Sequence, residues 1–251
     1  MTLTLILGQR GTQHNHLRRG IGVVQNAPMC SHYQGIKEAE RYERRFGVPP
    51  PKGPGKHDLW PGYLGSFIRL HRHAGVGDEA RPAHEALNGL FGLVPHWATD
   101  TMLTKHTYNA RSETVAEKPS FRDAWHRDQH CIIPADAIFE PDWRSGKAIA
   151  TRIAHADGEP LGIAGLWSCW KSPQGVVYSY TMLTIHADTH PLMRQFHKPA
   201  DEKRMVVILQ PHQYADWLAA PASRSMEFMA PYPAELLTAT APPPREGVLF
   251  Q

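Results

Sequence analysis

The sequence predicts an α+β protein with mainly antiparallel strands, a barrel-like core and flanking short helices in a single domain. Seven short apolar segments are separated by turn residues, a pattern typical of strands. No regular helices link them, which argues against a doubly wound parallel sheet and favours a sheet that closes toward a barrel. The length of 251 residues and the hydrophobic content of 41% suit a domain with a substantial core.

The N-terminal third contains one helix between two irregular segments. Residues 1–29 show neither helical nor strand periodicity, so we interpret them as a disordered leader or the result of a misassigned start. Residues 37–46, KEAERYERRF, are strong helix formers, and Gly47 follows them as a C-cap. The proline- and glycine-rich residues 49–56 predict a loop.

The rest of the chain is predicted to consist mostly of short strands. We expect these over 64–70, 87–94, 130–140, 148–154, 161–170, 176–185 and 204–209. Helical pieces are expected over 112–126, 189–196 and 211–219. Residues 30–220 would form the main domain and residues 221–251 a C-terminal extension, linker-like over 241–247.

Composition excludes several classes of protein. The three cysteines, Cys30, Cys131 and Cys169, are far apart, which argues against a disulfide framework or a cysteine-rich zinc site and favours a reducing cytoplasm. No apolar run approaches the ~18–20 residues of a membrane span. The HNH and HRH triplets at 14–16 and 71–73 lack partner spacing, so neither a metal nor another cofactor is expected. A net charge of +3 permits a nucleic-acid partner without proving one.

Several short motifs occur together in one order. They are MC (29–30), WPG (60–62), LFGLVPHW (90–97), YNARSE (108–113), IIPADAIFEPDW (132–143) and FHKPADEKRMVVIL (196–209). In this combination the chain resembles the SOS-response-associated peptidase family, whose members crosslink to abasic sites in DNA. The resemblance runs from Cys30 to about Ala219.

The resemblance implies roles for individual residues. After removal of the initiator methionine, Cys30 would be the first residue and would join covalently to the aldehyde of an abasic site. Asn109, Glu140 and His197 would be the other active-site residues. The implied DNA contacts are Arg111, Arg204, Trp97, Pro61 and Thr184. The expected partner is single-stranded DNA with abasic sites, bound by a monomer in the cytoplasm or at the nucleoid; protein partners are left open.

The chemistry of an N-terminal cysteine fits this interpretation. Imine formation needs a neutral amine, and at pH ~7.5 roughly a third of an α-amine is neutral against about 0.1% of lysine. The thiol can then close a five-membered thiazolidine on the same carbon, a fast step because it is intramolecular. His197 and Glu140 are suited to the proton transfers, and arginines such as Arg111 and Arg204 can bind phosphate in a bidentate manner.

Each residue also has a simpler interpretation. Cys30 could be an ordinary buried cysteine, Asn109 a turn residue and Trp97 a core residue. Arg111 could form an ion pair with Glu113 at a helix start. Glu140 lies in an apolar segment, where it is either an edge residue or a buried functional acid. His197 could be an exposed loop residue.

Three departures from the family pattern stand out. Ser31, His32 and Tyr33 follow the cysteine where the family usually has an arginine or a similar polar residue. Residues are inserted between His197 and Arg204, and Pro141 follows Glu140 where an aromatic residue is common.

The leader is the largest departure, because an internal Cys30 has no free amine. We favour a start at Met29 followed by trimming over self-cleavage of the leader. Two other functions remain open: an N-terminal-nucleophile thiol hydrolase or autopeptidase, and a non-covalent module for single-stranded DNA. β-Elimination is a further side reaction that an imine permits.

Overall fold

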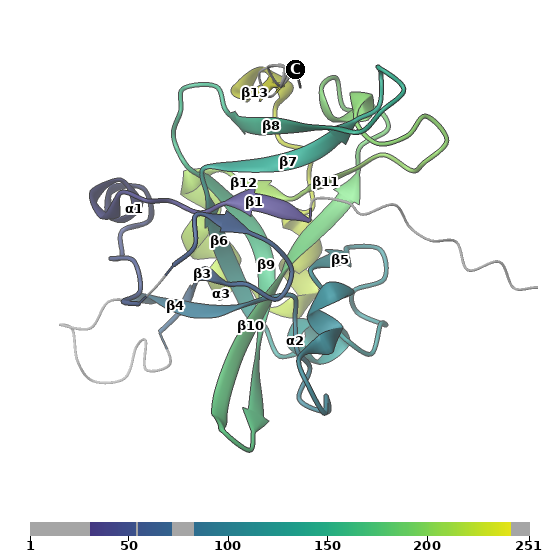
Figure 1. The fold of residues 1–251 in the computed structure, drawn as a ribbon. Helices are drawn as coiled ribbons and strands as arrows, with labels where there is room; N and C mark the ends of the chain where they lie inside the picture. The colour runs from purple at the N-terminus through teal and green to yellow at the C-terminus, as the bar shows by residue number, and fades with distance from the viewer. Residues whose placement is uncertain (1–30, 54, 72–82, 242–251) are drawn as a thin grey trace, which may run out of the picture.

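The computed structural model describes residues 31–53, 55–71 and 83–241. The expected leader, Cys30 and residues 242–251 lie outside the described residues, so the linker expected over 241–247 lies almost wholly outside them too. Two sheets and several short helices make up the fold (Figure 1). This arrangement confirms the predicted α+β class with a barrel-like core in a single domain.

Five strands close into a barrel in the order β10–β4–β3–β6–β9, and the ring closes because β9 pairs with β10. The barrel strands are β3 (Leu64–Leu70), β4 (His84–Phe91), β6 (His130–Ala135), β9 (Leu161–Ser172) and β10 (Gly175–His186). Neighbouring barrel strands are antiparallel, except that β4 and β10 are parallel. Three short strands extend this sheet: β5 (Asn109–Arg111), β11 (Arg204–Val206) and β12 (Ile208–Leu209).

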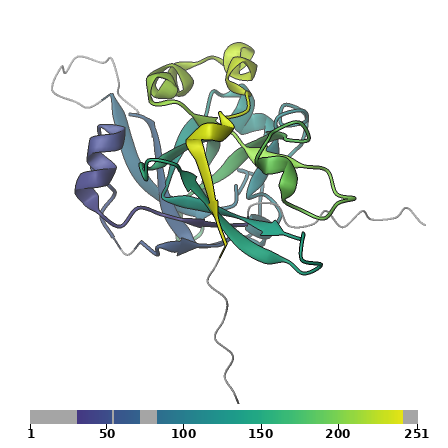
Figure 2. The same cartoon turned by 90° about the horizontal axis from the view of Figure 1, so that it is seen from above.

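The second sheet has five antiparallel strands in the order β13–β8–β7–β1–β2. These are β1 (His32–Gln34), β2 (Asp58–Leu59), β7 (Ala137–Asp142), β8 (Ile149–His155) and β13 (Leu237–Thr240). β7, β8 and β13 lie above the barrel in Figure 1, and Figure 2 shows β13 in yellow crossing the front of the molecule. The segment after residue 220 therefore contributes a strand to this sheet.

The helices are short and lie around the sheets (Figure 2). They are α1 (Ala39–Phe46), α2 (Arg122–His126) and α3 (Tyr214–Ala219), with the 3-10 turns η1 (Met102–Lys105), η2 (Met193–Gln195), η3 (Pro211–Gln213), η4 (Ala222–Phe228) and η5 (Ala234–Leu236). α1 confirms the expected helix and ends at Gly47, whose φ of +71° suits a glycine cap. None of the helices in the described segments is long and apolar enough to cross a membrane.

The helix expected over 112–126 is wrong in its extent. Only α2, at its end, is helical, and the preceding residues form turns. Pro119 explains the break, because proline disfavours helical backbone in the residue before it. The helical piece expected over 189–196 is reduced to the single 3-10 turn η2, whereas η3 and α3 confirm the piece over 211–219.

Most predicted strands are confirmed, but β4 starts and ends three residues earlier than expected, and two of the predicted strands are each divided between partners. Residues 130–140 form β6 in the barrel and β7 in the other sheet, because at Asp136 the backbone N–H turns to the Gln34 carbonyl at 2.7 Å. Residues 204–209 divide at Val207, since β11 pairs with β10 and β12 with β9. Hydrophobic patterning finds the apolar run but not the point where the chain changes partner.

Candidate active site

A buried acid and a buried histidine form the first part of the candidate site. Glu140 lies on β7, and His197 lies in the loop between η2 and β11. Their side chains are each 1% exposed, and His197 Nε2 lies 3.3 Å from a Glu140 carboxylate oxygen. His197 Nε2 makes no hydrogen bond to that oxygen, so the two side chains are held in contact by the packing around them.

His197 has an unusual backbone conformation. Its φ of +65° lies in the left-handed region, which costs energy for a residue with a Cβ. The His197 N–H donates to the Pro141 carbonyl at 2.9 Å, and Lys203 Nζ donates to the His197 carbonyl at 3.3 Å. These bonds fix the loop against β7 and hold the imidazole beside Glu140.

The surroundings of His197 favour its neutral form. Burial is the largest cause that lowers the pKa of His197, and the positive charge of Lys203 lowers it further. The backbone carbonyl of Arg204 and the carboxylate of Asp201 oppose this shift without cancelling it. The imidazole is therefore mostly neutral at pH 7, with one N–H donor and one acceptor.

Strand β1 lies directly beside β7. His32 pairs with Phe139, the residue before Glu140, and the two strands are antiparallel. Cys30 itself lies outside the described residues, two positions before His32 in the sequence. Among the sequence-predicted active-site residues, the structure thus brings Glu140 and His197 together.

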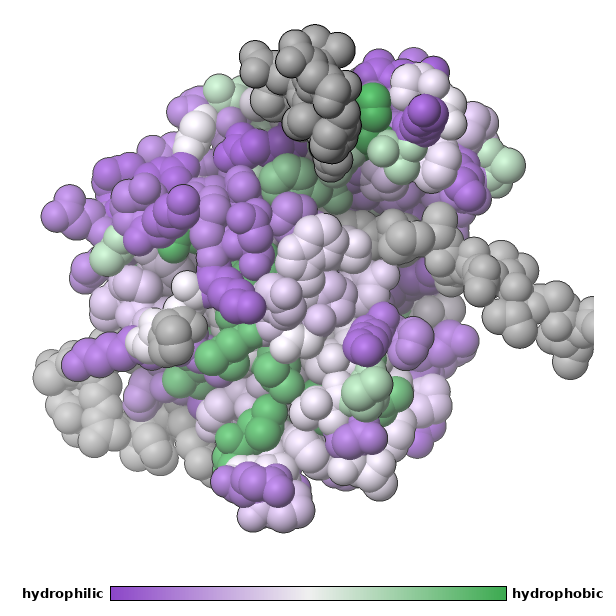
Figure 3. Space-filling view, viewed as in Figure 1, coloured by the Kyte–Doolittle hydropathy of each residue, from purple (hydrophilic) through white to green (hydrophobic). Residues whose placement is uncertain are grey.

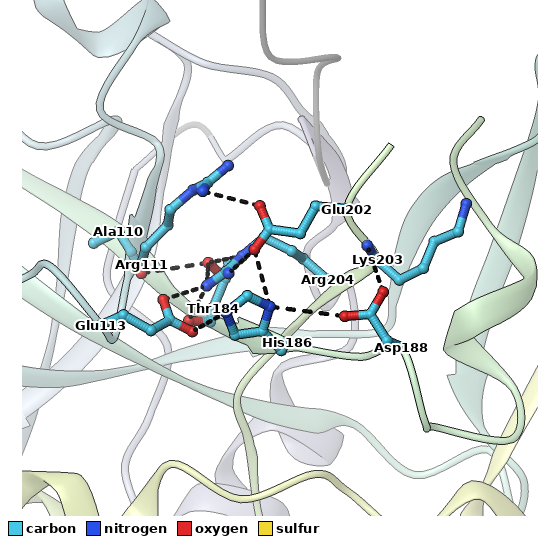
Figure 4. Close-up of polar contacts among 9 residues, drawn as sticks. All are labelled: Ala110, Arg111, Glu113, Thr184, His186, Asp188, Glu202, Lys203 and Arg204. Atoms are coloured by element: carbon cyan, nitrogen blue, oxygen red, sulfur yellow. Dashed lines mark hydrogen bonds and ion pairs between the residues drawn. The ribbon is translucent and has the colours of Figure 1, made fainter. Parts of the chain in front are cut away.

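A second cluster gathers at the end of β10 (Figure 4). β5 pairs with β10 so that Arg111 lies opposite Thr184, and β11 pairs with it so that Arg204 lies opposite His186. The side chains of Arg111, His186 and Arg204 meet two glutamates, Glu113 and Glu202 (Figure 4). The predicted contacts Arg111, Thr184 and Arg204 are therefore neighbours.

Arg204 is the centre of this cluster and is only 1% exposed. Its guanidinium donates to Glu202 at 2.7 Å, to Glu113 at 2.8 Å and to the Thr184 carbonyl at 2.9 Å. Burial alone would raise the pKa of Glu113, but the hydrogen bond from Arg204 and the nearby positive charges hold it below its ordinary value. Arg204 is thus tightly bonded within the protein.

Glu202 connects three cationic or titratable side chains. Besides Arg204, it contacts Arg111 Nη1 at 2.9 Å and His186 Nδ1 at 2.9 Å. Glu202 belongs to the segment between His197 and Arg204. The simple interpretation that pairs Arg111 with Glu113 is wrong, because Arg111 pairs with Glu202 and Glu113 pairs with Arg204.

The remaining predicted residues lie around these two groups. Asn109 is part-buried on β5 opposite Met182 of β10. Trp97 is 48% exposed, and it lines a surface pocket of about 420 Å³ together with Met102 of η1. Pro61 is half-buried in the turn between β2 and β3.

Sequence reasoning missed several residues of the site. Glu202 and His186 are central members of the cluster in Figure 4, and neither was expected from the sequence. Thr184 and His186 are two apart on one strand, a spacing that places side chains on the same face and could have indicated His186. Nothing local in the sequence indicates that Glu202 meets Arg111 and His186, because these two partners lie on strands well separated from it in the chain.

The face of the molecule in Figure 3 is mainly hydrophilic, with a narrow seam of apolar side chains in the lower half of the view. Several large apolar side chains elsewhere in the described residues are exposed too: Trp60, Tyr63, Leu64, Leu70, Trp97, Met102, Ile149, Val176 and Met226. Within the described ranges, no group of three or more His, Cys, Asp or Glu side chains could hold a metal ion.

Comparison with protein families matches residues 29–242 to the family model described as SOS response associated peptidase (SRAP). The chain belongs to the SRAP family. The match covers most of the chain and includes both sheets and the cluster of Figure 4.

Similar SRAP proteins include abasic site processing protein YoqW from Bacillus subtilis, which is 36% identical over 129 residues, 51% of this chain and 54% of that protein. Abasic site processing protein HMCES from Xenopus tropicalis is 29% identical over 129 residues, 43% of this chain and 38% of that protein. The chain thus spans about half or less of the length of these relatives. A crystal structure of a Bordetella bronchiseptica protein is 48% identical, with a TM-score of 0.76, over 84% of this chain and 99% of that one.

Proposed function

We propose that this protein captures abasic sites in single-stranded DNA by forming a covalent crosslink through Cys30. The observation that carries the proposal is the buried Glu140–His197 pair beside the strand that follows Cys30. Two residues of extended chain span at most ~7 Å, so Cys30 is tethered close to His32. The names of the relatives, which describe processing of abasic sites, support the choice of substrate.

The proposed reaction has two steps. The α-amine of Cys30 adds to the aldehyde carbon of the opened sugar, and loss of water gives an imine. The thiol sulfur then adds to the same carbon while its proton passes to the nitrogen, which closes a thiazolidine ring. Water is the only product released. The reaction requires a free amine at Cys30, and hence a chain that begins there.

Glu140 and His197 have distinct proposed roles. An abasic sugar is mostly a closed hemiacetal, so ring opening needs proton transfer at the ring oxygen, which we assign to His197. We assign Glu140 to proton transfer at the amine and the departing water. Because burial lowers the pKa of His197, its neutral imidazole can accept a proton at pH 7 while its one N–H donates a hydrogen bond to the ring oxygen. Asn109 would orient the reacting groups through its amide.

The β10 cluster is the proposed phosphate-binding region. Arg111 is the more accessible of the two arginines, with 34% of its side chain exposed against 1% for Arg204. We therefore assign the direct phosphate contact to Arg111, while Arg204 positions the acids and Thr184 around it. Trp97 and Pro61 would contact the bases or sugars that flank the lesion.

The test uses protein that begins at Cys30 and a single-stranded oligonucleotide with one abasic site, analysed on a denaturing gel. We expect a heat-stable shifted band that is absent for Cys30→Ala. Glu140→Gln and His197→Gln should form the band at least ~10-fold more slowly, since positioned proton transfer contributes a factor of ~100 or more. Exposed Glu235→Gln and His212→Gln are matched controls and should react at the wild-type rate.

Other outcomes would replace the proposal. Binding without a covalent band would favour a non-covalent module for single-stranded DNA. Turnover of peptides that depends on Cys30 would favour a thiol peptidase, the activity in the family's name. A band that persists in Cys30→Ala would assign the crosslink to a different nucleophile.

A further inference from the structure

Three aromatic rings form a continuous column at the edge of the five-stranded sheet. The imidazole of His32 lies between Trp60 and Phe139, and both ring-centroid distances are 4.1 Å. The interplanar angles are 5° and 14°, so the three rings are nearly parallel. His32 Nε2 lies 2.9 Å from Asp58 Oδ1, and this contact fixes the rotation of the central ring.

The outer ring of the column is held on a rigid turn. Residues Trp60, Pro61, Gly62 and Tyr63 form a β-turn closed by a 2.9 Å bond from the Tyr63 N–H to the Trp60 carbonyl. Gly62 has a φ of +87°, which matches the glycine position of a type II turn, and proline precedes it as that turn prefers. The Gly62 N–H also donates to the Phe91 carbonyl at 2.6 Å, which attaches the turn to β4.

The column is covered at one end and open at the other. Phe139 is part-buried and the His32 side chain is 15% exposed, whereas Trp60 is 44% exposed. Among the described residues no second ring stacks on the indole. Beside it, Tyr63 is 38% exposed and Lys56 Nζ lies 4.0 Å from the Tyr63 ring centre. An exposed indole on a preformed stack, next to a cation, has the character of a site for an aromatic ligand in an anionic polymer.

The column also lies beside the proposed reaction centre. Phe139 precedes Glu140 on β7, so these two side chains project from opposite faces of the strand, whereas His32 follows Cys30 by two residues, the spacing of side chains on one face. We propose that the open face of Trp60 is a stacking subsite for an unpaired nucleobase adjacent to the abasic sugar. This inference rests on the proposed function, since it takes the ligand to be single-stranded DNA centred on Cys30. The inference assigns a role to Trp60. It also explains why a histidine suits position 32, since its flat ring fills the space between Trp60 and Phe139.

The test measures binding to oligonucleotides that contain a tetrahydrofuran abasic analogue, which has no aldehyde and so cannot crosslink. Further oligonucleotides lack the base on the 5′ or the 3′ neighbour as well. Because stacking on an aromatic side chain is worth ~1–3 kcal/mol per base, Trp60→Leu should weaken binding roughly 5- to 100-fold, and Trp60→Phe much less. If Trp60 stacks on one of the two neighbouring bases, removing that base should abolish the effect of the substitution. Wild type and Trp60→Leu should then bind that oligonucleotide equally.

Controls separate stacking from a change in fold. Met226→Ala removes another exposed apolar side chain and should bind every oligonucleotide as the wild type does. Thermal unfolding of Trp60→Leu and Trp60→Phe shows whether either variant is destabilised. The inference is overturned if Trp60→Leu binds like wild type, or if it weakens binding equally whichever base is absent.

Failure of this inference differs from failure of the proposed function. A protein that crosslinks a true abasic site but shows no coupling between Trp60 and a neighbouring base retains its function and lacks the subsite. A protein that shows this coupling and forms no crosslink retains the subsite and loses the proposed chemistry.

Discussion

At the scale of single residues, Glu202 has the most direct consequence for binding. Its carboxylate contacts Arg204, His186 and also Arg111, the side chain to which we assign the direct phosphate contact. A phosphate oxygen and a carboxylate oxygen accept the same hydrogen bonds from a guanidinium. In the proposed function, Glu202 would therefore compete with the phosphate for Arg111.

This competition predicts that Glu202→Gln binds undamaged single-stranded DNA more tightly, roughly fivefold at low salt, because Arg111 no longer has an internal anion. Fluorescence anisotropy at about 50 mM and about 200 mM salt measures the change, and the gain should shrink at the higher concentration. Arg204 keeps its bond to Glu113, so little stability should be lost.

The matched control for that experiment is Glu227→Gln, which removes the same charge from an exposed pair with Arg224. It should change affinity far less. If both variants bind equally well, the effect is one of net charge, and if Glu202→Gln binds more weakly, Glu202 supports the site instead of blocking it.

At the scale of elements, local sequence predicts most of the strands and the helix α1. The helix that ends at Gly47 follows from its helix-forming residues and its glycine cap, and the strand over 64–70 follows from its short apolar pattern. These signals all lie within a few residues of one another. The breaks at Asp136 and Val207 do not, because they depend on which distant strand offers the next hydrogen bond.

The candidate site also has some features that the sequence predicts and others that depend on distant parts of the chain. Motif resemblance indicates Glu140 and His197, and the structure brings them together. The bonds of Glu202 and the stacking of Trp60 on His32 join residues from separate strands and loops, and no spacing in the sequence encodes them. Their positions follow only from the register of the folded sheets.

Strand β9 offers a test of how the barrel closes. Gly165 pairs with Cys131 of β6 and with Met182 of β10, so this residue lies where β9 contacts both neighbours. A Cβ at this position would overlap the Thr181 carbonyl oxygen and the Ile133 side chain. The glycine lets three strands approach closely at this point.

Gly165→Ala should therefore lower the free energy of unfolding by about 1–3 kcal/mol, because the backbone carbonyl cannot move aside cheaply. Denaturant unfolding measures this change. Gly55→Ala is the control, since no atom lies within 4 Å of the added methyl group, and its stability should stay equal or rise slightly. Wild-type stability for Gly165→Ala would mean that the barrel accommodates the methyl group.

At the scale of the whole molecule, the C-terminal segment is tied to the barrel through a buried histidine. His130 begins β6, is 1% exposed and packs against Trp217 of α3, with ring centres 4.1 Å apart and ring planes tilted by 33°. Its Nε2 lies 2.9 Å from the hydroxyl of Ser225 on η4. One imidazole thus joins the barrel to both α3 and the turn that leads to β13.

This joint makes the fold sensitive to acid. Burial lowers the pKa of His130 to about 4, against an ordinary value of 6.5, and the partly opposing charge of Asp128 does not restore it. Between these two pH values the unfolded chain binds a proton that the folded protein excludes. Stability contributed by the neutral imidazole is therefore complete above pH 6.5 and is lost as the pH falls toward 4.

We expect this histidine alone to reduce the free energy of unfolding by up to about 3 kcal/mol across that range, at 1.36 kcal/mol per pH unit. His130→Gln, which can still bond to Ser225 and does not titrate, should show a flatter profile even if it is less stable at pH 7. Denaturant unfolding at several pH values from 4 to 7 measures both proteins. Exposed His212→Gln is the matched control and should follow the wild-type profile. Parallel profiles for wild type and His130→Gln would mean that the acid sensitivity of the fold comes from other groups, and that the joint between barrel and C-terminal segment does not depend on an uncharged imidazole.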